Sequence, residues 1–238
     1  MKTDKYMIMG RNCLSEILRS APERVKKLYT AKPESDPLVQ KAKNASIHVV
    51  FKRKDELSHL VGSDSHQSYI AEVKPKAAID VRVFLEEDHD ESLVLMLDNI
   101  NDPQNLGALL RAAECFGVDL VVWSKNRGCS ITPVVTKASV GASEIIDIAQ
   151  VSNLAETVKK FQKAGYEVVT CEVGKEATEL RHFSFSKKTV VIMGSEGKGI
   201  QPLVSKLADA KVYIPMYGMI DSLNVSQATA VILSHYKK

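Results

Sequence analysis

The sequence has few cysteines, and none are arranged as pairs. Its 238 residues contain only Cys13, Cys115, Cys129 and Cys171, which lie far apart and form no CxxC motif. Such spacing indicates neither a disulfide framework nor a zinc site. We therefore expect reduced thiols and no bound metal.

Long apolar runs are also missing. Although 45% of the residues are hydrophobic, no segment approaches the ~18 consecutive apolar residues that a membrane-spanning helix needs. The first residues, MKTDKYMIMGRN, lack the apolar core of ~7–15 residues and the cleavage site of a signal peptide. We expect a cytoplasmic protein that uses no membrane.

The net charge of +3 is small but unevenly distributed. Residues 1–76 hold 15 lysines and arginines against 9 acidic residues, and residues 77–238 hold 17 against 20. The front segment therefore carries +6 and the remainder −3. A basic surface of this kind attracts polyanions such as RNA, although many basic surfaces bind no particular partner.

Residues 1–76 are expected to form a small α/β domain with a mixed or parallel sheet, because helical patterns alternate with short apolar runs. In chain order we predict a helix near 13–19, a strand near 25–31, a helix near 37–44, a strand near 47–51, a helical turn near 55–60 and a strand near 68–73. Residues 77–91, which end in an acidic cluster, have the composition of a linker with room for a short strand.

Residues 92–238 alternate between apolar strands and helices, which is typical of a parallel sheet. Strands are predicted near 93–97, 120–123, 167–171, 190–193 and 212–215. Two helices have clear ends. Asp102 can cap a helix that begins at Pro103 and stops at Gly117, and Asn153 can cap another that stops at Gly165.

Polar and glycine-rich segments follow three of these strands, at 98–105, 194–199 and 215–224. Singly, each has a plain structural explanation, such as a tight turn, or Ser222 as a helix N-cap with Asn224 in the first turn. In the segment 194–199 the glycines are spaced as GxxGxG. This spacing differs from the GxGxxG motif of dinucleotide-binding proteins and from the GxxxxGK[ST] motif of phosphate-binding loops. Because ligands bind beyond the carboxyl ends of parallel strands, the three segments can converge on one site.

Arg111 lies on the polar side of the helix that begins at Pro103, one turn after Gly107. The missing side chain of Gly107 would leave a shallow groove along which the arginine can lie. A guanidinium in that position can clamp a phosphate through two hydrogen bonds. The plain alternative is a solvated surface arginine.

At these segments the sequence closely resembles the SpoU (TrmH) family of the SPOUT methyltransferases. Three family motifs occur in order within 98–111, 192–200 and 214–226, and the segment 132–142 also matches. The front of the chain more weakly resembles the N-terminal substrate-binding domain of those members that methylate a guanosine of 23S ribosomal RNA. The matching segments there are 10–12, 25–31 and 66–73.

This resemblance implies an α/β protein with two domains. A C-terminal parallel-sheet SPOUT domain, residues 92–238, would contain a trefoil knot, which is an exception to the rule that chains do not thread loops. A smaller N-terminal α/β domain, residues 1–76, would bind RNA, with residues 77–91 as linker. The resemblance further implies a homodimer formed by the catalytic domains and S-adenosylmethionine as the cofactor.

The motif match also assigns site residues. The cofactor would be held by Met193, Gly194, Gly199, Ile214, Met216, Leu223 and Ser226. The reactive site would contain Asn105, Arg111, Glu196 and Asn224, and the candidates for RNA contacts are Arg11, His66, Gln67 and Arg111. An arginine is a poor base because its pKa exceeds ~12. We therefore expect Arg111 to clamp a phosphate and to stabilise a developing alkoxide, with proton acceptance by Arg111 as a hypothesis. Glu196 is the rival base, or it orients Arg111 or Asn105; the sequence leaves the choice of base between Arg111 and Glu196 open.

The expected activity is methyl transfer from S-adenosylmethionine to a ribose 2′-hydroxyl of RNA, with a guanosine of 23S ribosomal RNA as the target. One alternative is a ribose of transfer RNA. Members that act on transfer RNA often carry terminal helical extensions in place of this front domain, which favours ribosomal RNA. The other alternative is a catalytically inactive RNA-binding dimer. The presence of every motif residue argues against it.

Overall fold

The computed structural model describes residues 5–195 and 197–237. The chain divides into two compact units. The first contains Met1–Ala77 and Ile131–Ile145, and the second contains Ala78–Ser130 and Ile146–Lys238. The chain therefore leaves the first unit, returns to it for one short segment, and then completes the second.

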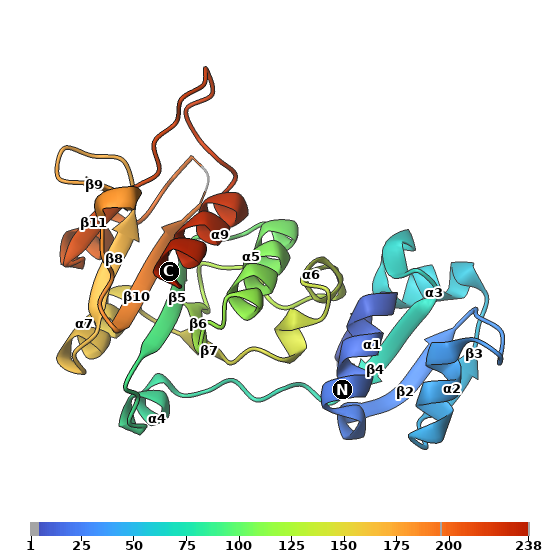
Figure 1. Ribbon diagram of the computed structural model, residues 1–238. Helices are drawn as coiled ribbons and strands as arrows, with labels where there is room; N and C mark the ends of the chain where they lie inside the picture. Colours follow the sequence, from blue (N-terminus) through green and yellow to red (C-terminus); the bar gives the residue numbers. More distant parts are fainter. Residues whose placement is uncertain (1–4, 196, 238) are drawn as a thin grey trace. The chain divides into compact units, whose positions relative to one another are not determined.

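A four-stranded mixed sheet forms the centre of the first unit (Figure 1). Its strands are β1 (Met7–Met9), β2 (Val25–Thr30), β3 (His48–Phe51) and β4 (Tyr69–Val73), and its helices are α1 (Arg11–Ser20), α2 (Pro37–Asn44), α3 (Lys54–Val61) and α6 (Pro133–Ala138). The strand order is β1-β4-β2-β3, with β2 and β3 parallel and the other pairs antiparallel. The predicted helices and strands of this region are confirmed, whereas β1 was not predicted.

Both faces of this sheet are covered, as the alternation of side chains along a strand requires. On one face Leu28 packs with Leu14 and Ile17 of α1 and with Val39 of α2. On the other face Tyr29 and Ile70 pack with Leu57 of α3, with Val134 of α6 against this cluster. The returning segment thus supplies part of the second face.

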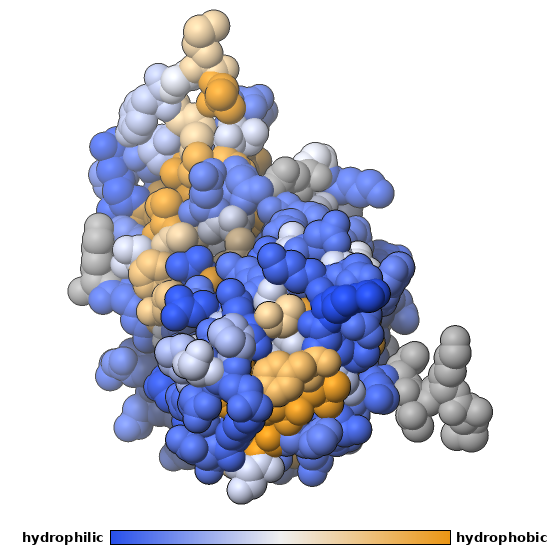
Figure 2. Space-filling view, turned by 90° about the vertical axis from the view of Figure 1, so that its right-hand side faces the viewer, coloured by the Kyte–Doolittle hydropathy of each residue, from blue (hydrophilic) through white to orange (hydrophobic). Residues whose placement is uncertain are grey.

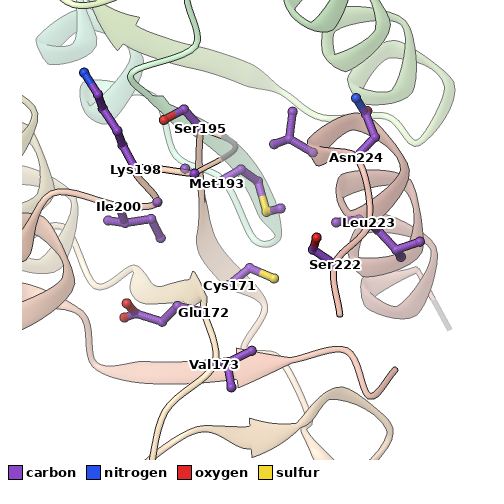
Figure 3. Close-up of a pocket in the computed structure, with 15 residues that line it drawn as sticks. Cys171, Glu172, Val173, Met193, Ser195, Lys198, Ile200, Ser222, Leu223 and Asn224 are labelled. Atoms are coloured by element: carbon purple, nitrogen blue, oxygen red, sulfur yellow. The ribbon is translucent and has the colours of Figure 1, made fainter. Parts of the chain in front are cut away.

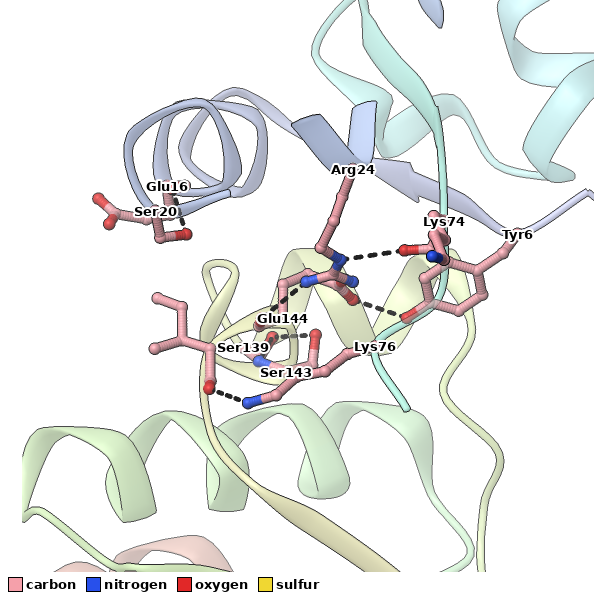
Figure 4. A network of polar contacts seen from close by, with 10 residues as sticks. Tyr6, Glu16, Ser20, Arg24, Lys74, Lys76, Ser139, Ser143 and Glu144 are labelled. Carbon is pink, nitrogen blue, oxygen red and sulfur yellow. Dashed lines mark hydrogen bonds and ion pairs between the residues drawn. The ribbon is translucent and has the colours of Figure 1, made fainter. Parts of the chain in front are cut away.

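A buried polar network joins the returning segment to the rest of the first unit (Figure 4). The Arg24 guanidinium lies 2.5 Å from the Glu144 carboxylate, and their side chains are 13% and 1% exposed. The Tyr6 hydroxyl donates to the same carboxylate at 2.6 Å. Arg24 also donates to the Lys74 carbonyl at 3.0 Å, and the Lys76 ammonium donates to the Ile145 carbonyl. Burial, followed by the Glu144 charge, raises the pKa of Tyr6 far above its usual value, so Tyr6 remains a donor.

The second unit is built on a seven-stranded, fully parallel sheet of order β7-β6-β5-β10-β8-β11-β9 (Figure 1). The strands are β5 (Ser92–Asp98), β6 (Leu120–Ser124), β7 (Ile148–Val151), β8 (Glu167–Cys171), β9 (Thr178–Glu179), β10 (Lys188–Gly194) and β11 (Ala210–Tyr213). The helices are α4 (Val81–Glu86), α5 (Pro103–Cys115), α7 (Leu154–Lys163), α8 (Pro202–Leu207) and α9 (Val225–Tyr236). The α/β class and the parallel sheet agree with the prediction.

Helices cover both faces of this sheet, which explains why its strands are apolar on both sides. One face packs against α4, α7 and α8 through residues such as Phe84, Phe161 and Val204. On the other face α5 and α9 pack against each other. Within the described residues, no helix is long and apolar enough to cross a bilayer.

Helix ends follow the predicted caps with one exception. The Asp102 carboxylate accepts hydrogen bonds from the backbone N–H groups of Gln104 and Asn105, and the Asn153 side chain accepts from Glu156. The interpretation of Ser222 as the last N-cap is wrong, because α9 begins at Val225 and its N-cap is Asn224.

The predicted linker contains a helix where a short strand was considered. Val81–Glu86 forms α4, and the Asp80 side chain caps it by accepting from the Arg82 N–H at 2.9 Å. Val81 and Phe84 pack one turn apart into the core of the second unit. Burial of this single face stabilises the helix. Strands β7 and β9 were also not predicted.

Candidate active site

A cavity of about 690 Å³ lies beyond the carboxyl ends of the neighbouring strands β8 and β10 (Figure 3). Its lining comes from three stretches, at 171–173, 193–200 and 222–228. The described lining residues are Cys171, Glu172, Val173, Met193, Gly194, Ser195, Gly197, Lys198, Gly199, Ile200, Ser222, Leu223, Asn224, Val225 and Ala228. Two of the three predicted strand-end segments therefore meet at this cavity.

The loop after β10 folds back on itself so tightly that one position must be glycine. A Cβ atom added to Gly194 would lie 2.4 Å from the backbone carbon of Gly199 and 2.5 Å from the Ile200 nitrogen. The Gly199 N–H donates to the Ser195 carbonyl at 2.9 Å. Gly197 and Gly199 have φ values of +80° and +62°, which favour glycine. At Gly194, Gly197 and Gly199 the loop thus presents bare backbone to the cavity.

The third segment reaches the cavity through a pair of asparagines. The Asn224 side-chain amide donates to Asn105 Oδ1 at 2.9 Å, although 119 positions separate the two residues. Asn224 Oδ1 in turn accepts from the Ser226 N–H at 2.9 Å and from the Ser226 hydroxyl at 2.6 Å. Asn224 therefore caps α9 and links it to the first turn of α5 at the same time.

Asp98, at the end of β5, anchors the far end of the glycine-rich loop. Its carboxylate is fully buried and accepts from both the Gln201 N–H at 2.7 Å and the Gln201 side-chain amide at 2.6 Å. A buried carboxylate requires such partners. The loop is thus closed at Gly194 and fixed at Gln201.

The structure brings only some of the predicted cofactor residues to this cavity. Met193, Gly194, Gly199 and Leu223 line the cavity. Ile214 lines a different cavity, between η4 (Leu180–His182) and α9, while Met216 is not among the described lining residues of either. Ser226 contacts the site through Asn224.

The predicted reactive residues are only partly brought together. Asn105 and Asn224 are in direct contact. Arg111 is exposed on α5 and does not line the cavity. Glu196 lies outside the described residues. In the part of the chain that is described, no group of three or more His, Cys, Asp or Glu side chains is placed to hold a metal ion.

The residues at the end of β8 were not predicted to contribute to the site. Cys171, Glu172 and Val173 all line the cavity, and the Cys171 sulfur points into it (Figure 3). Burial would raise the pKa of Glu172, but hydrogen bonds from Ser205, Thr170 and Lys211 outweigh burial and hold it below its usual value. Their position could have been predicted from the sequence, because 167–171 was expected to be a strand of the same parallel sheet and ligands bind beyond the carboxyl ends of such strands.

Cys171 is expected to react slowly with alkylating reagents. Burial, followed by the Glu172 charge, raises the pKa of its thiol to about 12, and only the thiolate is a good nucleophile. At pH 8 the thiolate fraction would be on the order of 10⁻⁴. Iodoacetamide labelling followed by mass spectrometry should therefore show Cys171 reacting at least tenfold more slowly than the exposed Cys115. Equal rates for the two thiols would contradict this account.

The candidate RNA-binding residues of the first unit differ in accessibility. His66 is only 3% exposed; its ring accepts from the Ser68 N–H at 2.9 Å and lies 3.1 Å from the Ser58 hydroxyl. Burial lowers the pKa of His66, which favours the neutral ring. Gln67 is exposed and accepts from the Arg11 N–H at 3.0 Å. His66 thus holds the turn that presents Gln67 beside Arg11.

Comparison with known families gives two matches that together cover nearly the whole chain. Residues 92–234 match the family described as "SpoU rRNA Methylase family". Residues 7–78 match the family described as "RNA 2'-O ribose methyltransferase substrate binding".

The similarity to individual relatives extends over nearly the whole of both chains. The 23S rRNA (guanosine-2'-O-)-methyltransferase RlmB of Coxiella burnetii is 34% identical, with 95% of this chain and 92% of that protein covered. The RlmB protein of Pseudomonas syringae pv. tomato is 36% identical, with the same coverage. The solved structure of the SpoU methyltransferase AviRb from Streptomyces viridochromogenes, in complex with AdoMet, has a TM-score of 0.80 at 19% identity. It covers 98% of this chain and 89% of that one, and shows a shared fold.

Proposed function

Since the chain belongs to the SpoU rRNA methylase family, we propose that it transfers a methyl group from S-adenosylmethionine to the ribose 2′-hydroxyl of a guanosine in 23S ribosomal RNA. The observation that carries this proposal is the cavity between the glycine-rich loop after β10 and the start of α9, beside the Asn105–Asn224 pair. The substrate class is proposed from the relatives, which are named 23S rRNA (guanosine-2'-O-)-methyltransferases.

The residues of the cavity fit S-adenosylmethionine. A volume of about 690 Å³ lies within the ~300–1,000 Å³ of small-molecule sites. Met193, Ile200 and Leu223 offer apolar surface for an adenine ring, and Gly194, Gly197 and Gly199 line the cavity without side chains, so that backbone hydrogen-bonding groups are accessible there. When bound, the sulfonium would supply an activated methyl group for attack by a ribose oxygen.

The protein's own task is to orient the ribose and to receive the proton of its 2′-hydroxyl. We assign orientation to Asn105 and Asn224, whose side chains are held by their mutual hydrogen bond. Arg111 is exposed and among the described residues makes no ion pair, so its guanidinium can receive an RNA phosphate and stabilise an alkoxide. Glu196 is the proposed alternative as proton acceptor.

The proposal includes the roles of the two parts of the chain. Residues 1–76, with their excess of positive charge, would grip the RNA, with Arg11 and Gln67 as contacts and His66 as the support of their turn. Residues 77–91 would act as linker and residues 92–238 as the methyltransferase domain. Its C-terminal segment would thread a trefoil knot, which the packing of α9 onto α5 supports. The site of action would be the cytoplasm, where ribosomal RNA is processed.

A homodimer is also part of the proposal. The loop between β11 and α9 projects from the second unit (Figure 1), and its tip is apolar in the view of Figure 2. Tyr217, Met219 and Ile220 are 82%, 104% and 77% exposed. Exposed apolar side chains gathered in this way typically mark an interface. We propose that a second copy of the chain covers them.

The test is transfer of labelled methyl from S-adenosylmethionine to 23S ribosomal RNA and to bulk transfer RNA in parallel. We expect ribose-methylated guanosine in the 23S RNA, and an at least tenfold lower rate for Arg111→Ala because a transition-state contact is lost. Nuclease digestion and mass spectrometry would identify the modified nucleoside.

Other outcomes would redirect the proposal. Label in transfer RNA alone would overturn the substrate class. Binding of S-adenosylmethionine without transfer to either RNA would favour the inactive RNA-binding dimer, provided that assembling ribosomal particles also remain unlabelled.

A further inference from the structure

Another cavity, the Arg127 cavity, has a volume of about 430 Å³ and lies at the carboxyl ends of β6 and β7. Its polar lining residues are Ser124, Asn126, Arg127, Ser152, Asn153 and Gln201. None of the described residues that line it is acidic. A positively charged, hydroxyl-rich cavity without a carboxylate is suited to an anion.

The guanidinium at this cavity is held through a buried carboxylate. Arg127 donates to Gln201 Oε1, and the amide nitrogen of the same Gln201 side chain donates to the fully buried Asp98 at 2.6 Å. Among the described residues, this is the only hydrogen bond of the Arg127 guanidinium, so its remaining N–H groups are available to a ligand. Arg127 is thereby oriented without being neutralised by a direct ion pair.

The loop that carries Arg127 is tightly built. A Cβ atom on Gly128 would lie 2.8 Å from the Trp123 ring, so the chain must bend against that ring at a glycine. The Lys125 N–H donates to the Val151 carbonyl and the Cys129 N–H to the Ile100 carbonyl, both at 2.9 Å. These contacts on either side of Arg127 fix the backbone from which its side chain extends.

The Arg127 cavity and the candidate active site are lined by residues that are adjacent in sequence. Gln201, which lines the Arg127 cavity, directly follows Ile200, which lines the cofactor cavity. The same Asp98–Gln201 contact therefore fixes the glycine-rich loop and orients Arg127.

We infer that Arg127 and its cavity bind a phosphodiester of the RNA substrate close to the ribose that is methylated. The inference rests on the proposed function and adds to it a specific phosphate subsite in the second unit. The serine hydroxyls and the asparagine amides of the cavity complete the donor set around the phosphate oxygens.

The test compares Arg127→Ala and Arg127→Lys with Arg82→Ala. Arg82 is a matched control because it is also an arginine of the second unit, 74% exposed, at the start of α4. Binding of a 23S RNA fragment is measured by filter retention at several salt concentrations, and that of S-adenosylmethionine by calorimetry. Thermal unfolding confirms that each variant is folded.

For Arg127→Ala we expect the Kd for RNA to rise about tenfold at low salt, with the slope of log Kd against log salt shallower by about 0.7, as for one lost phosphate contact. The Kd for S-adenosylmethionine should stay within twofold of the wild type. Arg127→Lys should recover the slope but only part of the affinity, because a lysine cannot form the bidentate contact. Arg82→Ala should bind RNA like the wild type.

Three results would overturn the inference. Unchanged RNA binding by Arg127→Ala would show that Arg127 does not bind a phosphate of the RNA. An equal weakening by Arg82→Ala would show that the effect is general charge attraction. A raised Kd for S-adenosylmethionine instead of RNA would assign the cavity to the cofactor's carboxylate. The proposed function fails separately, since absence of methyl transfer by the wild-type protein would leave the RNA-binding comparison intact.

Discussion

Gly194→Ala is expected to weaken S-adenosylmethionine binding at least a hundredfold and to bring methyl transfer below detection. The added methyl group would lie 2.4 Å from the Gly199 backbone, a distance at which the backbone itself must move. Since Gly194 and Gly199 both line the cavity, opening the loop removes the surface that the cofactor would contact. Calorimetric titration with S-adenosylmethionine measures the effect directly.

The matched control is Gly174→Ala, which lies in the exposed loop after β8 and would place its methyl group in open space. It should bind the cofactor within about twofold of the wild type, as expected for a substitution away from packed contacts. Cofactor binding by a folded Gly194→Ala protein at wild-type strength would show that the loop after β10 does not form the site.

Arg24→Ala is expected to destabilise the first unit by about 3 kcal/mol, because removing one partner of a buried ion pair leaves the other charge uncompensated. Glu144 is 1% exposed and would keep the Tyr6 hydroxyl as a partner but lose the guanidinium. Urea unfolding followed by circular dichroism would measure the change in the free energy of unfolding.

Arg19→Ala provides the control for this prediction. Its guanidinium pairs with Glu16 at 2.7 Å on the surface of α1, where it is 68% exposed. Surface pairs contribute about 0–1 kcal/mol, so the control should unfold almost like the wild type. A loss below about 1 kcal/mol for Arg24→Ala would mean that water or a rearranged side chain compensates Glu144.

Much of the fold follows from local sequence signals. Asp102 and Asn153 cap the helices that they were predicted to cap, because an N-cap depends on its own side chain and the next three backbone N–H groups. The strands of the parallel sheet were recognisable because burial on both faces requires continuous apolar runs. Strands β1 and β9, with three and two residues, are too short to give such a signal.

Other features depend on contacts between distant parts of the chain. Ser222 and Asn224 are both competent N-caps, and the hydrogen bond to Asn105 accompanies the choice of Asn224. In the same way, nothing in the sequence near Glu144 indicates that it pairs with Arg24, 120 positions away. The anion-binding character of Arg127 likewise arises only when Gln201 and Asp98 are brought beside it.

The return of Ile131–Ile145 to the first unit affects the order in which the protein can fold during synthesis. The first unit lacks α6 and the Glu144 carboxylate until residue 145 has been made, by which time β5 and β6 of the second unit already exist. At ~5–20 residues per second, the ribosome needs roughly 3–14 s to pass from residue 77 to residue 145. During that interval one sheet face of the nascent first unit is incompletely covered, and Arg24 lacks its carboxylate partner.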